Sequence, residues 1–125
     1  IKGIVITHGH EDHIGGLAYL LKTVNIPVYG TKLTIGLIQG KLKEHGLLSS
    51  AKLHEVAPGD VIKLGAFTIE MIHVNHSIPD AIALAIKCDC GTVVQTGDFK
   101  IDSPPIDGGM NCWQAVWDRL HVWMH

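Results

Sequence analysis

The sequence predicts an α/β (α+β) fold built on a mixed sheet, and three observations support this prediction. The first half alternates short β-branched runs with stripes of apolar residues at helical spacing. The second half is a series of strand candidates separated by Gly, Pro and Asp. With 125 residues, 46% of them hydrophobic, the chain can bury one core but not two ordinary domains. The order of the elements does not follow the doubly wound Rossmann pattern.

The first strand–helix unit lies at the start of the chain. Residues 2–7 are apolar and β-branched, which predicts a buried strand that ends at His8. Apolar residues at helical spacing from Leu17 predict a helix that runs up to Asn25. A short strand follows at 27–29 and ends at Gly30.

A second helix is predicted from Thr31 to Gly46. Threonine is a favourable N-cap, and glycine is a natural stop just after a helix. Gly36 and Gly40 lie inside this helix and weaken it by about 1 kcal/mol each relative to alanine. The side chains expected to face the core are Leu33, Ile35, Leu37, Ile38 and Leu42.

The second half of the chain predicts strands joined by short turns. The turns are expected at the Pro58-Gly59-Asp60 sequence, at 65–66 and at 89–91. The predicted strands are 51–56, 61–64, 67–74, 81–87 and 92–96.

Composition excludes several classes of protein. The net charge of -2 predicts no strong general attraction to nucleic acid or to a membrane surface. No apolar run is long enough to span a bilayer, and no signal peptide is visible at Ile1. Cys88, Cys90 and Cys112 are an odd number of cysteines, which indicates reduced thiols in a cytoplasmic protein. Cys88 and Cys90 have no partnering cysteine pair, so they do not predict a metal site.

The strongest chemical signal is an H-x-H-x-D-H motif at the end of the first strand. It consists of His8, His10, Asp12 and His13, and shuffling this composition would produce it in roughly three chains per thousand. Imidazole and carboxylate groups are the ligands that borderline divalent ions accept. His8 and His10 are two residues apart, so they point to one side of an extended segment. Four ligands within six residues fit two adjacent ions better than one.

Two further ligands are expected from later strand ends. His76 follows an apolar strand, and Asp98 follows the strand at 92–96. Loops at strand ends build sites on a rigid sheet, and Gly97 would allow the backbone to approach closely. A carboxylate such as Asp98 can bridge two cations, which an imidazole cannot do. The residues predicted to be catalytic are Asp12, His76 and Asp98.

Each later residue also has a simpler interpretation when it is taken alone. His76 could be a surface histidine, and Asp98 could be a turn-forming aspartate. The remaining histidines are expected to be structural or exposed: His73, His45, His54, His121 and His125. Glu11 is expected to face away from the cluster, with a hydrogen bond to a ligand as the alternative.

With these residues in place, the chain resembles the metallo-β-lactamase superfamily and, within it, the ribonuclease J family of the β-CASP group. The similarity covers about residues 1–110, and the Asn75–Asp80 sequence is its most specific part. The matching stretches are 5–16, 27–31, 42–45, 75–80 and 96–102.

The resemblance implies a four-layer αββα sandwich, incomplete here, with two divalent ions, zinc or manganese. One ion would be held by His8, His10 and His76, and the second by Asp12 and His13, while Asp98 would bridge them. Members of the family cut RNA as endonucleases and as 5′-to-3′ exonucleases in the cytoplasm, and a homo-oligomer is expected.

The chain departs from the family in ways that predict a partial domain. The family has strands before the histidine cluster, a β-CASP domain and a last metal-ligating histidine, and this sequence has none of them. Residues 1–110 are therefore expected to form part of a metallo-β-lactamase domain. Residues 111–125 hold all three tryptophans and do not resemble the family.

Three functional hypotheses follow. The first is RNA phosphodiester hydrolysis by a hydroxide that two metal ions activate, with Asn75 and Ser77 donating hydrogen bonds to the phosphate. The second keeps the fold but changes the substrate to a thioester, a lactone or a β-lactam. The third is a metal-binding fragment without catalysis, which has exposed sheet edges that favour association.

Overall fold

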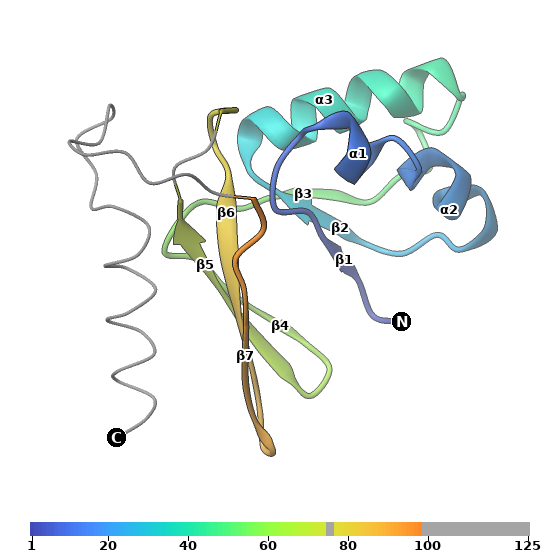
Figure 1. Ribbon diagram of the computed structural model, residues 1–125. Coiled ribbons are helices and arrows are strands. Elements are labelled where there is room, and N and C mark those ends of the chain that lie inside the picture. The colour runs from blue at the N-terminus through green and yellow to red at the C-terminus, as the bar shows by residue number, and fades with distance from the viewer. Residues whose placement is uncertain (75–76, 99–125) are drawn as a thin grey trace.

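A computed structural model describes residues 1–74 and 77–98, which form two sheets and three helices. Figure 1 shows the helices on one side of a parallel sheet and an antiparallel sheet on the other side. The described residues therefore build a helix layer, a first sheet and a second sheet. This agrees with the predicted α/β class, and parallel and antiparallel pairing occur in separate sheets.

The parallel sheet is built from strand–helix units. Its strands are β1 (Ile4–Val5), β2 (Val28–Gly30) and β3 (Leu53–Glu55), in that spatial order. Parallel neighbours need a crossover connection, and helices provide it here. The crossovers contain α1 (Glu11–Ile14), α2 (Leu17–Thr23) and α3 (Lys32–Glu44).

The antiparallel sheet is a meander in which each strand pairs with the next. Its strands are β4 (Val61–Leu64), β5 (Phe67–His73), β6 (Ile82–Cys88) and β7 (Gly91–Gln95). The backbone N–H of Ile82 donates a hydrogen bond to the carbonyl of Thr7 at 2.9 Å. This bond joins the start of β6 to the segment just after β1, where the histidine motif begins.

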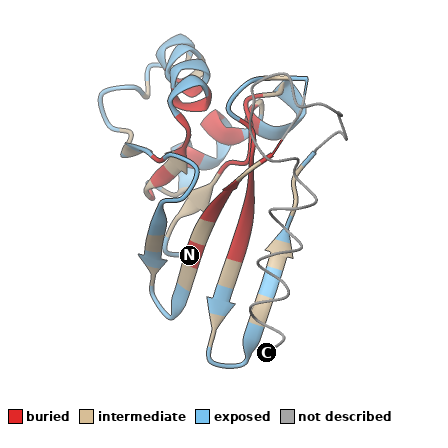
Figure 2. Ribbon diagram, turned by 90° about the vertical axis from the view of Figure 1, so that its left-hand side faces the viewer, coloured by how far each residue is buried: buried red, intermediate tan, exposed pale blue. Residues whose placement is uncertain are grey.

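Apolar side chains fill the spaces between the layers. Ile38, Leu42 and Val28 are fully buried between the helices and the parallel sheet. Met71 and Ile82 are buried between the two sheets. Figure 2 shows that burial is concentrated among the helices and in the upper part of the antiparallel sheet, whereas its hairpin ends are exposed. The most buried part of the fold is thus the end that carries the histidine motif.

Helix α3 begins and ends where the sequence predicts. Gly46 adopts φ +70, and the N–H of Leu47 donates to the carbonyl of Leu42 at 2.9 Å, as in a Schellman motif. The expected inward direction of Leu33 and Leu37 is wrong, because these side chains are 38% and 39% exposed. The buried residues of α3 are instead Thr34, Ile35, Ile38 and Leu42.

The segment after His10 also differs from the prediction. No helix was predicted between His8 and Leu17, and the structure has one turn of helix there, α1. The carbonyl of His10 accepts hydrogen bonds from the N–H groups of His13 at 2.9 Å and of Ile14 at 3.1 Å. Four residues are too few for a periodic apolar pattern, so the sequence carried no signal for this helix.

Replacing Ile38 with alanine is expected to reduce the free energy of unfolding by about 2–5 kcal/mol, because a fully buried side chain is lost and a cavity remains. Urea denaturation measures this change. Leu33→Ala on the exposed face of the same helix is the control and should cost about 1 kcal/mol or less. Equal losses in the two variants would contradict the burial pattern of α3.

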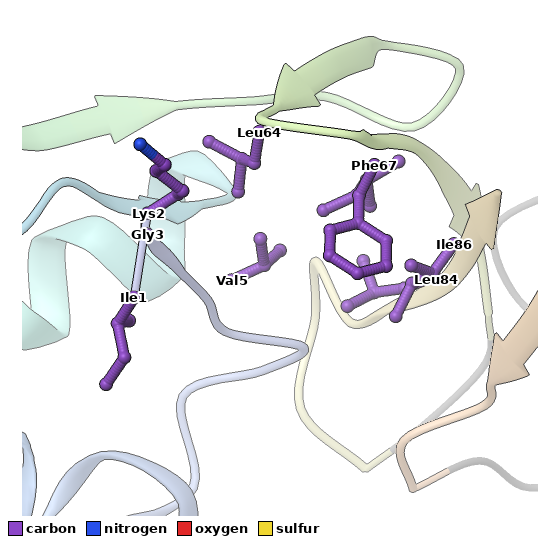
Figure 3. Close-up of a pocket in the computed structure, with 9 residues that line it drawn as sticks. Ile1, Lys2, Gly3, Val5, Leu64, Phe67, Leu84 and Ile86 are labelled. Atoms are coloured by element: carbon purple, nitrogen blue, oxygen red, sulfur yellow. The ribbon is translucent and has the colours of Figure 1, made fainter. Parts of the chain in front are cut away.

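An apolar cleft opens between the two sheets at the start of β1, and its volume is about 600 Å³. Figure 3 shows Val5 and Leu64 facing the same space as Phe67, Leu84 and Ile86. Apart from Lys2, its lining side chains are apolar, so they offer no metal ligands. Among the described residues, no helix combines the length and the apolar character that crossing a bilayer requires.

Candidate metal centre

The candidate site lies just beyond the end of β1, where the chain turns into α1. His8 and His10 occupy the extended segment between these two elements, and His10 is the N-cap of α1 with φ −65 and ψ 149. The single turn of α1 then carries Asp12 and His13. A strand end followed at once by a helical turn thus presents four potential ligands within six residues.

His8 is the most enclosed member of the cluster. Its side chain is fully buried, and its Nδ1 atom lies 3.0 Å from the Oγ1 atom of Thr7. This contact orients the imidazole, and its Nε2 atom lies 3.7 Å from Oδ2 of Asp98. Histidines that bind metals ordinarily form a hydrogen bond with the other ring nitrogen, which holds the ring in place.

The other two imidazoles of the motif converge on His8. The ring centroid of His10 lies 4.9 Å from that of His8, and the two rings are nearly perpendicular. The ring centroid of His13 lies 4.0 Å from that of His8. Three imidazoles therefore share one small region.

Asp98 arrives at the same region from the segment after β7. Its Oδ2 atom lies 3.6 Å from Nε2 of His13, and the Oδ2 atom of Asp12 lies 3.6 Å from the same nitrogen. Donor atoms come within 4.8 Å of one another in two groups, one of His8, His10 and Asp98 and one of Asp12, His13 and Asp98. Asp98 is the member that the two groups share.

This donor set fits divalent ions. Separations of 3.6–3.7 Å are too long for hydrogen bonds. Two ligands that each lie about 2.0–2.1 Å from a tetrahedral ion are about 3.3–3.4 Å apart, which is close to the distances seen here. Nitrogen and carboxylate oxygen donors without thiolates suit zinc and also manganese.

Gly97 allows Asp98 to come this close. It adopts φ +59, and a Cβ atom added there would lie 3.0 Å from both Cβ and Oγ1 of Thr7. Glycine adopts this backbone freely, and it has no Cβ atom to collide with Thr7. The close approach expected at Gly97 is therefore confirmed. The residue that it approaches is Thr7, which also contacts His8.

Ser77 is the described residue of the 75–80 loop that approaches the cluster. Its Oγ atom lies 3.5 Å from Nε2 of His10. The predicted ligand His76 and the predicted phosphate contact Asn75 lie outside the described residues. The Trp-rich segment at 111–125 lies outside them as well.

Glu11 faces away from the cluster. Its Oε1 atom accepts a hydrogen bond from Nζ of Lys41 at 2.7 Å, which links α1 to α3. That bond raises the pKa of Lys41 above its usual value. Desolvation opposes this rise to a smaller extent, and the charges of Glu11 and Glu44 add to it. Glu11 therefore supports the short helix that carries Asp12 and His13.

Sequence reasoning did not identify Asp80 as a residue that positions the site. Its backbone carbonyl accepts a hydrogen bond from Oγ1 of Thr31 at 2.8 Å, and its Oδ2 atom accepts one from the N–H of Leu33 at 3.3 Å. Asp80 thus caps α3 from a distant loop, whereas the Thr31 side chain makes no capping bond within its own helix. In the sequence, Asp80 was notable only as the last residue of the Asn75–Asp80 stretch that contains His76.

Asp80 also adopts φ +64, which asparagine tolerates and alanine does not. Asp80→Ala is expected to reduce the free energy of unfolding by about 1–2 kcal/mol, because the helix loses a capping group and the backbone becomes strained. Urea denaturation measures the loss. Asp80→Asn keeps an acceptor oxygen and the same backbone preference, so it should cost less than half as much. If Asp80→Asn lost as much free energy of unfolding as Asp80→Ala, the negative charge would matter more than the capping hydrogen bond.

Residues 1–116 match the family model for the β-lactamase superfamily domain. The chain is 50% identical over 115 residues to a ribonuclease J of Thermus thermophilus, with 86% of this chain and 20% of that protein covered. It is 51% identical over 110 residues to a ribonuclease J of Synechocystis, with 86% of this chain and 17% of that protein covered. The chain therefore spans about a fifth of the length of these curated relatives.

The fold is also similar to that of solved structures. A metallo hydrolase from the archaeon Ignicoccus hospitalis, Igni18, superimposes with a TM-score of 0.59 at 22% sequence identity. The match covers 82% of this chain and 44% of Igni18. At this identity the similarity supports the fold alone, and it agrees with the layers described above.

Proposed function

The chain belongs to the β-lactamase superfamily, and from this premise we propose that it forms the metal-binding part of a ribonuclease that hydrolyses RNA phosphodiester bonds. The observation that carries the proposal is the sharing of Asp98 by two groups of donor atoms. Support for the substrate comes from the curated relatives, which are named ribonuclease J. Because the chain covers about a fifth of their length, the proposed activity is that of a longer protein.

We assign the ligands as two sets. His8 and His10, with His76, would hold one ion, Asp12 and His13 would hold the other, and Asp98 would contact both. Two divalent ions, zinc or manganese, supply Lewis acidity and make water a stronger nucleophile near neutral pH. Burial of His8 and its contact with Thr7 keep this imidazole oriented for the first ion.

The remaining roles concern the substrate. The hydroxyl of Ser77 lies beside His10, so it can donate a hydrogen bond to a phosphate oxygen that reaches the first ion. Asn75 would donate a second bond. Asp12 and Asp98 would repel a phosphate by themselves, so substrate binding depends on cations that reverse the charge of the site. We place the longer protein in the cytoplasm and expect it to be a homo-oligomer.

The proposed assignment predicts the behaviour of a His76 variant. In the longer protein, His76→Ala should reduce RNA hydrolysis by about 100-fold or more, because the first ion loses one ligand. Hydrolysis of a labelled RNA oligonucleotide in the presence of zinc or manganese measures this. His54→Ala is the control, since His54 is exposed and stacks on Tyr29 away from the cluster. Unchanged hydrolysis in a metal-loaded His76→Ala protein would reject the assignment.

Two alternatives remain distinguishable by experiment. A thioester, lactone or β-lactam hydrolase would turn over one of these compounds faster than RNA under the same metal loading. A metal-binding chain without catalysis is the outcome we expect for the 125 residues alone, since they span only about a fifth of the length of the curated ribonucleases. Equilibrium dialysis of the chain with zinc, followed by an RNA assay, separates this outcome from an active nuclease.

A further inference from the structure

Two cysteines lie at the turn between β6 and β7, Cys88 at the end of β6 and Cys90 within the turn. Cys88 pairs with Gly91 in the register of the hairpin, so Asp89 and Cys90 form the turn. This turn lies at the end of the hairpin opposite to Ile82, whose N–H bonds to Thr7 beside the metal centre. Ile82 and Cys88 are the two ends of β6 and lie six positions apart, which corresponds to about 20 Å. Figure 1 shows this hairpin end extending away from the helices.

The two thiols are in direct contact and accessible. The Sγ atoms of Cys88 and Cys90 are 3.0 Å apart, and the Sγ atom of Cys88 lies 3.5 Å from the carbonyl oxygen of Gly91. Cys90 is exposed and Cys88 is partly buried. Cα atoms two residues apart in a turn are about 5–6 Å from one another, which lies within the range that a disulfide accepts.

The environment makes the two thiols unequal. The hydrogen bond from the Cys90 thiol lowers the pKa of Cys88, and a backbone N–H bond from Cys90 adds to this effect. The same thiol contact raises the pKa of Cys90. Cys88 is therefore the better nucleophile near neutral pH, and Cys90 is placed to attack the Cys88 sulfur once that sulfur is part of a mixed disulfide.

We propose that Cys88 and Cys90 form a redox-active dithiol that low-molecular-weight disulfides oxidise to an intramolecular disulfide. The thiolate of Cys88 attacks one sulfur of the small disulfide, forms a mixed disulfide and releases one small thiolate. The thiolate of Cys90 then attacks the Cys88 sulfur and releases the second small thiolate. Two protein thiols are oxidised, one small disulfide is reduced, and both thiol protons leave to solvent or to the released thiolates.

A metal site explains the pair less well. A structural zinc site has four ligands, and two thiols supply half of them. Within residues 1–74 and 77–98, the groups of three or more potential ligands contain no cysteine. The pair also lies outside both ligand groups of the metal centre, so this inference does not depend on the proposed function. It goes beyond the expectation of reduced thiols, because it assigns them a reaction.

The test uses the 125-residue chain with Cys112→Ser, which leaves two thiols. The probe is bis(2-hydroxyethyl) disulfide, and intact mass and thiol titration are the measurements. The expected product has both thiols lost and a mass lower by two hydrogen atoms, without a bound probe fragment. Chains that retain one probe fragment on each cysteine, or that become linked to one another, would overturn the proposal.

Two variants test the roles of the cysteines. Cys90→Ser should stop the reaction at a mixed disulfide on Cys88, because the serine hydroxyl cannot displace the bound fragment. Cys88→Ser removes the thiol that raises the pKa of Cys90, so it should form a mixed disulfide on Cys90 that goes no further. In the chain that keeps both thiols, limiting iodoacetamide at neutral pH should alkylate Cys88 about three- to tenfold more than Cys90, which peptide mass mapping measures. Equal alkylation of the two thiols would contradict the assigned roles. Zinc binding should be the same in the oxidised and reduced chains.

Discussion

Replacing Asp98 with asparagine is expected to weaken zinc binding at both ligand groups, by about 100-fold or more for the ion that binds tighter. The carboxylate of Asp98 belongs to both groups, and its Oδ2 atom lies 3.7 Å from His8 and 3.6 Å from His13. Asparagine has nearly the same shape but no charge, so the variant removes the shared anionic ligand and preserves the volume. Loss of a charged ligand costs more than the 10- to 100-fold that supporting residues usually contribute.

Competition with a coloured zinc chelator measures the affinity, and equilibrium dialysis measures the number of bound ions. Asp89→Asn is the matched control, because Asp89 is an exposed carboxylate in the β6–β7 turn and should leave zinc binding unchanged. Two ions bound to Asp98→Asn with the original affinity would show that this residue is not a ligand. In the longer protein, the same variant should lose RNA hydrolysis.

Replacing Gly97 with alanine is the second change with a large expected effect. The new Cβ atom would approach Cβ and Oγ1 of Thr7 to 3.0 Å, and φ +59 is a strained conformation for alanine. The backbone must therefore move away from Thr7, whose hydroxyl contacts His8. Asp98 moves with it, so zinc affinity is expected to fall by about 10- to 100-fold.

Gly46→Ala separates this effect from general backbone strain. Gly46 has a similar φ of +70, but an added Cβ atom would meet nothing within 4 Å. Gly46→Ala should lose about 1 kcal/mol of folding free energy in urea denaturation because of its positive φ, and Gly97→Ala should lose more because its Cβ atom also meets Thr7. Only Gly97→Ala should also lose zinc affinity in the chelator competition. Equal zinc affinity in both variants would contradict the role of the Thr7 contact.

The sequence predicted correctly those helices and strands that depend on residues close together in the chain. The strand before His8, the helices near residues 17–25 and 31–46, and the hairpins of the second half all follow from local periodicity and from turn residues. The helix α1 was missed because a single turn has no periodicity. Leu33 and Leu37 were misassigned because the apolar residues of α3 lie on more than one face, so their spacing alone did not identify the buried face.

Composition and motif spacing by themselves determined the α/β class and the kind of chemistry, since imidazoles and carboxylates two or three residues apart share one surface after a strand. Tertiary structure alone decided that Asp98 lies beside His8 and His13, that Gly97 packs on Thr7 and that Asp80 caps α3. These contacts join residues that are 47 to 90 positions apart in the chain. Their geometry depends on how two sheets pack through buried side chains, and no local pattern encodes that packing.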